Sequence, residues 1–292
     1  MKNNRGLGDK AFDTINVFIM LVFIATIVIP FIYIFSISIS DPQLVVRGQI
    51  WLLPKKITFV SYQMVFNFKG FWYAYYNTFW YTFVGTAIGV LMTIISAYPL
   101  TKRNLPGKNI YLIFLMITMY FGGSMIQYYL LMKDIHLIDT RWAIVLPGAV
   151  GIYYIIVVRT FIDSLPDSLM ESAKIDGASD IAILIKIVIP LSKAVIAVIL
   201  LYYAVGQWNS YMPALLYLNR SELYPVQVIL QRILISVQGN KALEGVVDTQ
   251  RQALGMGIRY GMIIITITPI LCIYPFIQKY FVKGVLIGSI KG

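Results

Sequence analysis

Long apolar stretches without a single charged residue alternate with short polar segments along the chain. Six of these stretches stand out, and the next longest, 57–68, is much shorter. They cover residues 14–40, 70–101, 109–132, 142–158, 194–219 and 260–278. A helix needs roughly 17 to 25 apolar residues to cross the hydrocarbon of a bilayer. The pattern therefore predicts an all-α polytopic membrane protein with six transmembrane helices.

The helices are expected to form one domain, 14–281, flanked by a cytoplasmic N-terminus at 1–13 and a cytoplasmic tail at 282–292. We place the spans at 14–40, 75–101, 109–132, 142–159, 191–218 and 259–281. Between them lie outer loops at 41–74 and 219–258 and a long cytoplasmic loop at 160–190. The first stretch is too long for a secretory signal peptide, whose apolar region has about 7 to 15 residues, so it is interpreted as a retained helix.

Composition supports the same class of protein. The chain is 59% hydrophobic and only 13% charged, whereas soluble domains carry about 25% charged residues. Of the 24 Lys and Arg residues, 13 fall in the two terminal segments, the 102–108 loop and the loop after the fourth stretch. Because basic residues of short loops favour the cytoplasmic side, both termini are expected in the cytoplasm of a cell-membrane protein. The net charge of +11 then reflects topology and attraction to anionic lipid, and no basic stripe with interleaved aromatics indicates nucleic acid.

Several chemistries lose support from what the stretches lack. The chain has one cysteine, Cys272, and one histidine, His136, so neither a disulfide nor a zinc cluster is expected. No Asp or Glu lies inside the six stretches, which disfavours an ion-coupled secondary transporter, although that alternative stays open. The chain also lacks the glycine-rich loop that cradles nucleotide phosphates, so active transport would draw its energy from another subunit. A membrane-embedded enzyme would need a cluster of titratable groups near the bilayer surface. The acids at 163–180 form the only such cluster, and a role on a helix surface explains them, so this alternative is disfavoured.

The loop after the fourth stretch carries the signals of a short helix. Ser164 is expected to cap its start, with Pro166 in the first turn and Asp167 completing a capping-box pattern. Gly177 is expected to end the helix. Ala173 and Gly177 would share one face, where missing side-chain bulk lets a partner surface approach. On these residues alone, a helix that docks a partner and a simple interfacial turn helix are equally good interpretations.

At this loop the sequence resembles a known family. Glu171-Ser172-Ala173, three residues, Gly177, nine residues and Ile187-x-Ile189-Pro190 resemble the signature Glu-Ala-Ala, three residues, Gly, nine residues, Ile-x-Leu-Pro. That signature is typical of the membrane subunits of binding-protein-dependent ABC importers. Ser172 and Ile189 depart from it by small or conservative changes.

The resemblance extends along most of the chain. The loop sequence Ile-Asp-Gly-Ala-Ser, the pair Trp208-Asn209 and the ending 278–292 are similar to carbohydrate importers of the maltose/maltodextrin type, in particular their second six-span permease. The segments 120–124 and 139–143 are similar to the branch that handles larger or unusual oligosaccharides. A permease for a non-sugar solute stays open as an alternative.

The resemblance implies a type I ABC importer transmembrane domain that works with partners. These are a second permease, expected to be a paralogue, an ATPase homodimer that binds ATP and Mg, and an extracytoplasmic solute-binding protein that contacts the 219–258 loop. The chain itself is expected to hold no cofactor or metal and to catalyse no reaction. The residues implied in coupling to the ATPase are Glu171, Ser172, Ala173, Asp176, Gly177, Ala178 and Pro190.

A sugar pathway should present aromatic faces and neutral hydrogen-bonding groups. The candidates within the spans are Gln127, Tyr153, Tyr154, Gln207, Trp208, Asn209 and Tyr211. Trp208 and Asn209 are expected to face the pore, because polar groups inside a span need partners or a wet cavity. The aromatics at 71–81 are interpreted as an interfacial belt. The pairs Gly85/Gly89 and Gly257/Gly261 are interpreted as points of close helix packing.

Overall fold

The computed structural model describes residues 7–241 and 249–289, so the predicted segments 1–13, 219–258 and 282–292 are described only in part. The described residues divide into two units. Unit 1 contains the chain up to Lys69 and Leu230–Ile267, and unit 2 contains Gly70–Ile229 and the residues from Thr268 onward. Each unit is described by itself.

Unit 1 begins with the long helix α1 (Leu7–Ser38), and short helices follow it. α2 (Pro42–Val46) begins where the Asp41 carboxylate accepts the backbone N–H of Gln43 at 2.9 Å. The next helix is α3 (Val60–Asn67). α14 (Val226–Lys241) and α15 (Thr249–Ser289) each lie partly in this unit. α1 is apolar and exposed along almost its whole length, as a helix that contacts lipid or a partner chain requires.

Close packing in unit 1 confirms the interpretation of the second glycine pair. A Cβ atom at Gly257 would lie 2.5 Å from Ser61 Oγ, and one at Gly261 would lie 3.5 Å from Ser61 Cβ. The missing side chains let α15 approach the backbone of α3. α15 continues as one helix to Ser289, through residues that we expected to begin the tail at 282.

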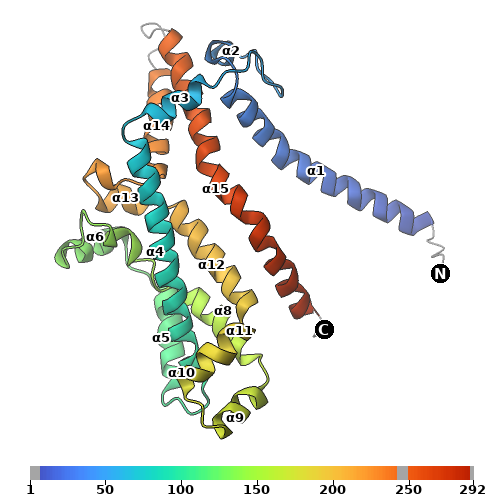
Figure 1. Cartoon of the computed structure of the whole chain (residues 1–292), viewed down its shortest axis with the longest axis vertical. Helices are drawn as coiled ribbons and strands as arrows, with labels where there is room; N and C mark the ends of the chain where they lie inside the picture. The colour runs from blue at the N-terminus through green and yellow to red at the C-terminus, as the bar shows by residue number, and fades with distance from the viewer. Residues whose placement is uncertain (1–6, 242–248, 290–292) are drawn as a thin grey trace. The chain divides into compact units, whose positions relative to one another are not determined.

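Unit 2 centres on α4 (Phe71–Ala97), which packs along α12 (Lys193–Trp208) (Figure 1). A Cβ atom at Gly85 would lie 2.7 Å from Gln207 Cδ, and one at Gly89 would lie 2.6 Å from Tyr203 Cε1. The first glycine pair is thus also confirmed as a packing contact. α8 (Ile152–Asp163) packs against both helices and contributes Ile155, Val158 and Ile162 to the largest buried cluster.

Several of the expected spans in unit 2 are interrupted. The third is divided into α5 (Lys108–Tyr120) and α6 (Met125–Asp134), and the chain bends by 111° at the break between them, which contains Gly122 and Gly123. The fourth is divided into α7 (Trp142–Val145) and α8, with the non-helical segment 146–151 between them. The fifth ends at Trp208 and is followed by α13 (Met212–Tyr217). Short 3₁₀ turns lie at Pro99–Thr101 and Ser221–Leu223.

The number of helices that could cross a membrane can be compared with the expected six within the part of the chain that the structure describes. There, three helices are long and apolar enough to cross a membrane, at Gly8–Ser38, Phe71–Thr101 and Leu254–Pro275. Counting each strongly bent helix pair as one span raises this number to five. Six spans therefore remain a prediction.

The predicted cytoplasmic loop forms a chain of short helices. α9 (Asp167–Ile175) is followed by α10 (Asp180–Ile183), a π-helical turn at Leu184–Val188 and α11 (Ile189–Leu191). The predicted capping box is wrong, because Ser164 Oγ donates to the carbonyl of Phe161 at 2.6 Å and Pro166 occupies the N-cap position. The predicted end of the helix is confirmed, since Gly177 adopts a left-handed φ of +80° directly after it.

Candidate functional site

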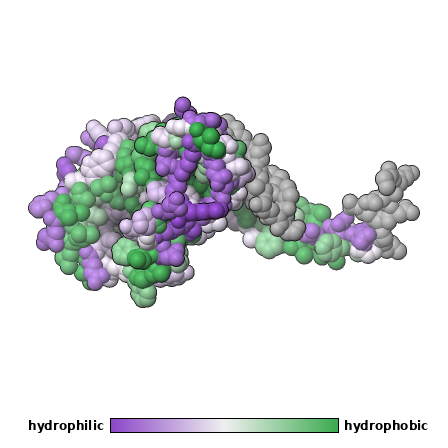
Figure 2. Space-filling view, turned by 90° about the horizontal axis from the view of Figure 1, so that it is seen from below, coloured by the Kyte–Doolittle hydropathy of each residue, from purple (hydrophilic) through white to green (hydrophobic). Residues whose placement is uncertain are grey.

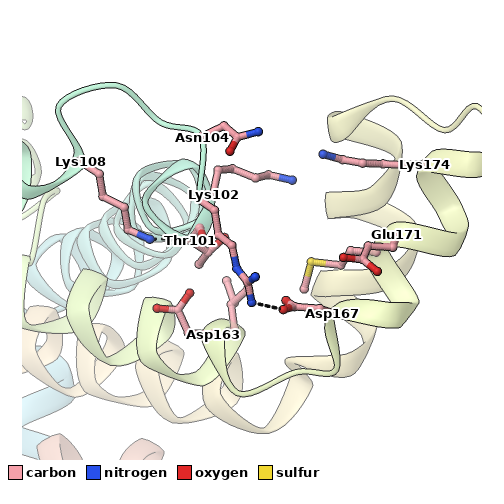
Figure 3. Close-up of a pocket in the computed structure, with 11 residues that line it drawn as sticks. Thr101, Lys102, Asn104, Lys108, Asp163, Asp167, Glu171 and Lys174 are labelled. Atoms are coloured by element: carbon pink, nitrogen blue, oxygen red, sulfur yellow. Dashed lines mark hydrogen bonds and ion pairs between the residues drawn. The ribbon is translucent and has the colours of Figure 1, made fainter.

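The first candidate site surrounds α9, at the end of unit 2 remote from α13 (Figure 1). Seen from that end, hydrophilic residues gather over the surface and apolar residues flank them (Figure 2). A cavity of about 460 Å³ separates α9 from the 101–108 loop. Figure 3 shows Lys102, Asn104 and Lys108 on the loop side and Asp167, Glu171 and Lys174 on α9.

Two ion pairs connect the α9 region to the loop that follows α4. Arg103 Nη2 donates to Asp167 Oδ2 at 2.5 Å, at the first residue of α9 (Figure 3). Lys102 Nζ donates to Asp180 Oδ1 at 2.7 Å, just beyond the end of α9. The two contacts bracket α9, so the helix and the 101–108 loop are held to each other at both ends.

Lys102 has a second partner and an altered titration. Its Nζ also donates to Tyr98 Oη at 2.7 Å. The hydrogen bond from Lys102 lowers the pKa of Asp180 below its ordinary value. Burial acts to lower the pKa of Lys102, but the hydrogen bonds to Asp180 and Tyr98 outweigh it and raise that pKa. Both groups therefore remain charged through the neutral range.

α9 presents different chemistry on its two faces. Met170 and Ala173 pack against the large apolar cluster, as does Ala178 after the helix. Ile175, on the opposite side of the helix, is 86% exposed, and Leu169, one turn before Ala173, is 44% exposed. The Ile175 side chain is therefore available for contact with a partner surface.

The second candidate site is a polar network between α4, α8 and α12. Thr93 Oγ1 donates to the carbonyl of Gly89 at 2.7 Å, so it accepts from Tyr203 Oη, 2.9 Å away. The same Tyr203 oxygen accepts the backbone N–H of Gly151 at 3.0 Å. The ring of Tyr154 lies 4.7 Å from that of Tyr203. One hydroxyl thus ties three helices together beside the interruption at 146–151.

The interruption itself is open on one side. Leu146, Pro147, Gly148 and Val150 are exposed, although they lie in the middle of an apolar stretch. Gln207 lies against this segment, since a Cβ atom at Gly148 would be 3.5 Å from Gln207 Nε2. The Oε1 atom of Gln207 is buried without a hydrogen-bond partner. Irregular backbone within a span is stable only where protein or a water-filled cavity covers it, so the predicted fourth span is expected to turn this surface away from lipid.

Comparison with known proteins assigns the chain to a family. Residues 70–287 match the family model of the binding-protein-dependent transport system inner membrane component. The chain belongs to this family. It is therefore a membrane-embedded permease subunit of a binding-protein-dependent ABC importer.

Relatives match this permease over nearly its whole length. The protein LplC of Bacillus subtilis strain 168 is 39% identical, over 97% of this chain and 96% of its own. The polygalacturonan/rhamnogalacturonan transport system permease protein YtcP of the same organism is 36% identical, over 97% and 99%. A crystal structure of a bacterial ABC transporter involved in the import of the acidic polysaccharide alginate matches with a TM-score of 0.86 and 33% identity, over 95% and 99% of the two chains.

The structure divides the residues predicted for coupling between the two faces of the permease's α9 region. Ser172, Asp176 and Gly177 are exposed, and Glu171 lines the cavity. The expectation that Ala173 shares an open face with Gly177 is wrong, because Ala173 and Ala178 pack inward against the core. Pro190 lies two residues before the break at which the chain bends by 83° between Asp180–Leu191 and α12.

The predicted pathway residues are also separated. Tyr153, Tyr154 and Gln207 lie around the 146–151 interruption, and the side chain of Tyr153 is 58% exposed. Trp208 was expected to face the pore, and this expectation is wrong. Its side chain is 4% exposed, and its ring centre lies 5.2 Å from that of Phe79.

The other three candidates occupy different positions in the permease. Asn209 is exposed and accepts from Gln227 Nε2 at 3.3 Å, whereas Tyr211 is half-buried against another apolar cluster. Gln127 completes a capping box with Ser124 at the start of α6, so its amide oxygen has a local structural role.

Sequence reasoning missed the residues whose roles depend on distant partners. Lys102 and Arg103 were interpreted only as topology signals, and the sequence assigned no partner to Tyr203. The exposed Ile175 could have been found, because an isoleucine interrupts the polar surface of α9 directly before Asp176. The partners of Tyr203 lie far from it in the chain, so no local pattern identifies them.

Proposed function

We propose that this permease imports an oligosaccharide into the cell, together with a second permease chain and an ATPase homodimer that binds and hydrolyses ATP with Mg. The observation that carries the coupling part is α9, a short exposed helix on the signature segment. The relatives YtcP and AraQ are named for polygalacturonan/rhamnogalacturonan and arabinooligosaccharide transport, and the matching crystal structure for import of alginate. These names favour a sugar oligomer as the substrate.

In this proposal α9 enters a cleft of the ATPase through its exposed face. Leu169 and Ile175 supply apolar contacts, and Gly177 leaves room at the end of the helix. When the ATPase pair closes on ATP, α9 moves with it. Because Asp167 and Asp180 are paired to Arg103 and Lys102, the 101–108 loop follows, and with it the ends of α4 and α5.

The sugar pathway is proposed to pass the open surface at 146–151. Tyr153 offers an exposed aromatic face, and the unpartnered oxygen of Gln207 offers an acceptor for a sugar hydroxyl after a small local movement. The Tyr203 hydroxyl fixes the segment at Gly151, so that it does not collapse onto α12. The second permease would close the other side of the pathway.

The proposed orientation puts both termini and α9 in the cytoplasm. The solute-binding protein would then dock on the opposite side, on the segments around 41–74 and 219–258. The basic residues of the 102–108 loop support this orientation through the positive-inside rule. Placing α9 in the cytoplasm also gives it access to ATP.

Purification of the tagged permease from its native membrane tests the function directly. The proposal expects a second permease and an ATPase to copurify, and uptake of labelled oligosaccharides in liposomes to require all subunits, ATP and the binding protein. A matched preparation with a hydrolysis-deficient ATPase should bind but not transport. Sugar transport by this chain alone in liposomes would overturn the proposal.

A further inference from the structure

The segment 139–143 contains a cation that the coupling and pathway assignments leave unused. Arg141 is half-buried directly before α7. Among the described residues it forms no ion pair, and its Nη2 atom donates a hydrogen bond to Asn77 Oδ1 at 3.1 Å. Holding a guanidinium partly away from water without a counter-charge costs free energy unless aromatic faces or an anion compensate.

The buried side chain of Asn77 fixes the orientation of Arg141. Asn77 is 1% exposed, and its amide nitrogen donates to the carbonyls of Glu222 at 2.6 Å and Tyr224 at 3.3 Å. These bonds set the amide so that its oxygen faces Arg141. One edge of the guanidinium is thereby anchored, while its remaining N–H groups have no partner in the described residues.

Aromatic rings frame the guanidinium. Its carbon lies 5.4 Å from the ring centre of Tyr76 and 5.2 Å from that of Trp80. Trp142 packs edge-to-face on Trp80 at 5.8 Å. The side chains of Tyr76 and Trp142 are 58% and 44% exposed, so both rings offer free surface beside the cation. The belt predicted at 71–81 is thus not uniform, since Phe71 and Tyr81 are each 1% exposed.

A second arginine, Arg220, pairs with the nearby carboxylate of Asp139, and Arg141 has no such partner among the described residues. Arg220 Nε donates to Asp139 Oδ2 at 2.9 Å, and Asp139 Oδ1 accepts the backbone N–H groups of Asn219 and Arg220. Burial acts to raise the pKa of Asp139, but these hydrogen bonds outweigh it and lower that pKa. Asp139 therefore remains ionised and is occupied by Arg220, so it does not neutralise Arg141.

We propose that Arg141, Tyr76 and Trp142 form a binding subsite for a sugar residue that carries a carboxylate. The inference rests on the proposed function and deepens it, because it names the substrate class as an acidic, uronate-containing oligosaccharide. The guanidinium fork receives the carboxylate in two parallel hydrogen bonds, and the exposed rings stack on the sugar faces. In the proposed orientation this subsite lies at the outer end of α4, where sugar released from the binding protein enters.

Uptake by the complete complex in liposomes, with its own binding protein, tests the subsite. The probes are trigalacturonate and the same trimer with its carboxyl groups reduced to alcohols. Arg141→Gln removes the charge, and Arg141→Lys keeps the charge without the fork. Lys133→Gln is the matched control, because it removes an exposed positive charge near the end of α6 without touching the aromatic frame.

We expect Arg141→Gln to lower the initial uptake rate of trigalacturonate about tenfold, the scale of one lost charge-assisted contact. The Lys variant should fall between Gln and wild type, and the neutral trimer and Lys133→Gln should be unaffected. Three results would overturn the inference. They are an equal loss of uptake for both trimers in Arg141→Gln, an equal effect of Lys133→Gln, and a wild-type complex that takes up only the neutral trimer.

Two further outcomes separate other causes. If the effect of Arg141→Gln occurs only in vesicles containing anionic phospholipid, Arg141 binds a lipid phosphate and the carboxylate subsite is wrong. If the wild-type complex takes up no oligosaccharide of either kind, the proposed function fails together with the subsite. Uptake that is intact but indifferent to Arg141 refutes the subsite alone.

Discussion

Substitution of Gly177 by Asp separates docking from folding at α9. Gly177 adopts φ +80°, and a Cβ atom built on it has no other atom within 4 Å. The variant therefore meets no steric clash inside the chain. The left-handed backbone conformation lowers its free energy of unfolding by about 1–2 kcal/mol for a residue with a side chain, and by less for Asp or Asn.

That cost is small beside the roughly 5–15 kcal/mol by which folded domains are stable, so the variant should fold. Gly48 supplies a matched control, because it has φ +66° and also no atom within 4 Å of an added Cβ. Gly48→Asp imposes the same backbone strain and adds the same charge outside the coupling segment of the sequence. We expect both variants to reach the membrane at wild-type abundance and to copurify with the ATPase, and Gly177→Asp to abolish uptake. Gly48 lies in the segment 41–74 proposed to face the binding protein, so Gly48→Asp controls for folding and assembly only.

The assay combines membrane abundance, copurification of the ATPase and uptake of labelled oligosaccharide in the same cells. Gly177→Asn adds bulk with little strain, whereas Gly177→Ala adds strain with little bulk. If docking decides the outcome, Asn should impair uptake more than Ala. Normal uptake in both Gly177→Asp and Gly177→Asn would refute the coupling role, and an equal loss of membrane abundance in Gly48→Asp and Gly177→Asp would attribute the defect to strain.

Three further predictions concern the contacts around the two candidate sites. Tyr203→Phe leaves the Gly151 N–H without its acceptor, so it should destabilise the purified complex by about 1–3 kcal/mol and lower its melting temperature, whereas Tyr202→Phe, on an exposed ring, should not. Equal melting temperatures for these two variants would contradict the network. Arg103→Asp and Asp167→Arg should each change stability by less than about 1 kcal/mol, because both side chains are largely exposed, yet lower the sugar transported per ATP hydrolysed. The combined charge swap should restore that ratio, and its failure to do so would argue against a mechanical link. Ile175→Ser should reduce ATPase copurification without lowering membrane abundance, because the side chain is 86% exposed, and Ile57→Ser, at 65% exposed, serves as control. Unchanged copurification in Ile175→Ser would remove this residue from the docking surface.

Local and solvent-driven features of this permease could be predicted from its sequence. Charge-free stretches identify a membrane protein because a charge in hydrocarbon is costly wherever the chain goes next. The end of α9 at Gly177 could be predicted because the left-handed conformation depends on that residue itself. The close approaches at Gly85 and Gly89 follow from the absence of a side chain at helical spacing.

Tertiary structure decided the features that depend on distant partners. Apolar composition does not distinguish a straight helix from one broken at 146–151, since both are apolar throughout. Ala173 faces inward and Trp208 is buried because α9 and α4 pack where they do. The pairs Lys102–Asp180 and Asn77–Arg141 join residues far apart in the chain. The sequence thus determined which segments leave water, by transfer free energy, whereas the packed fold decided which side chains meet, by geometry that no local pattern contains.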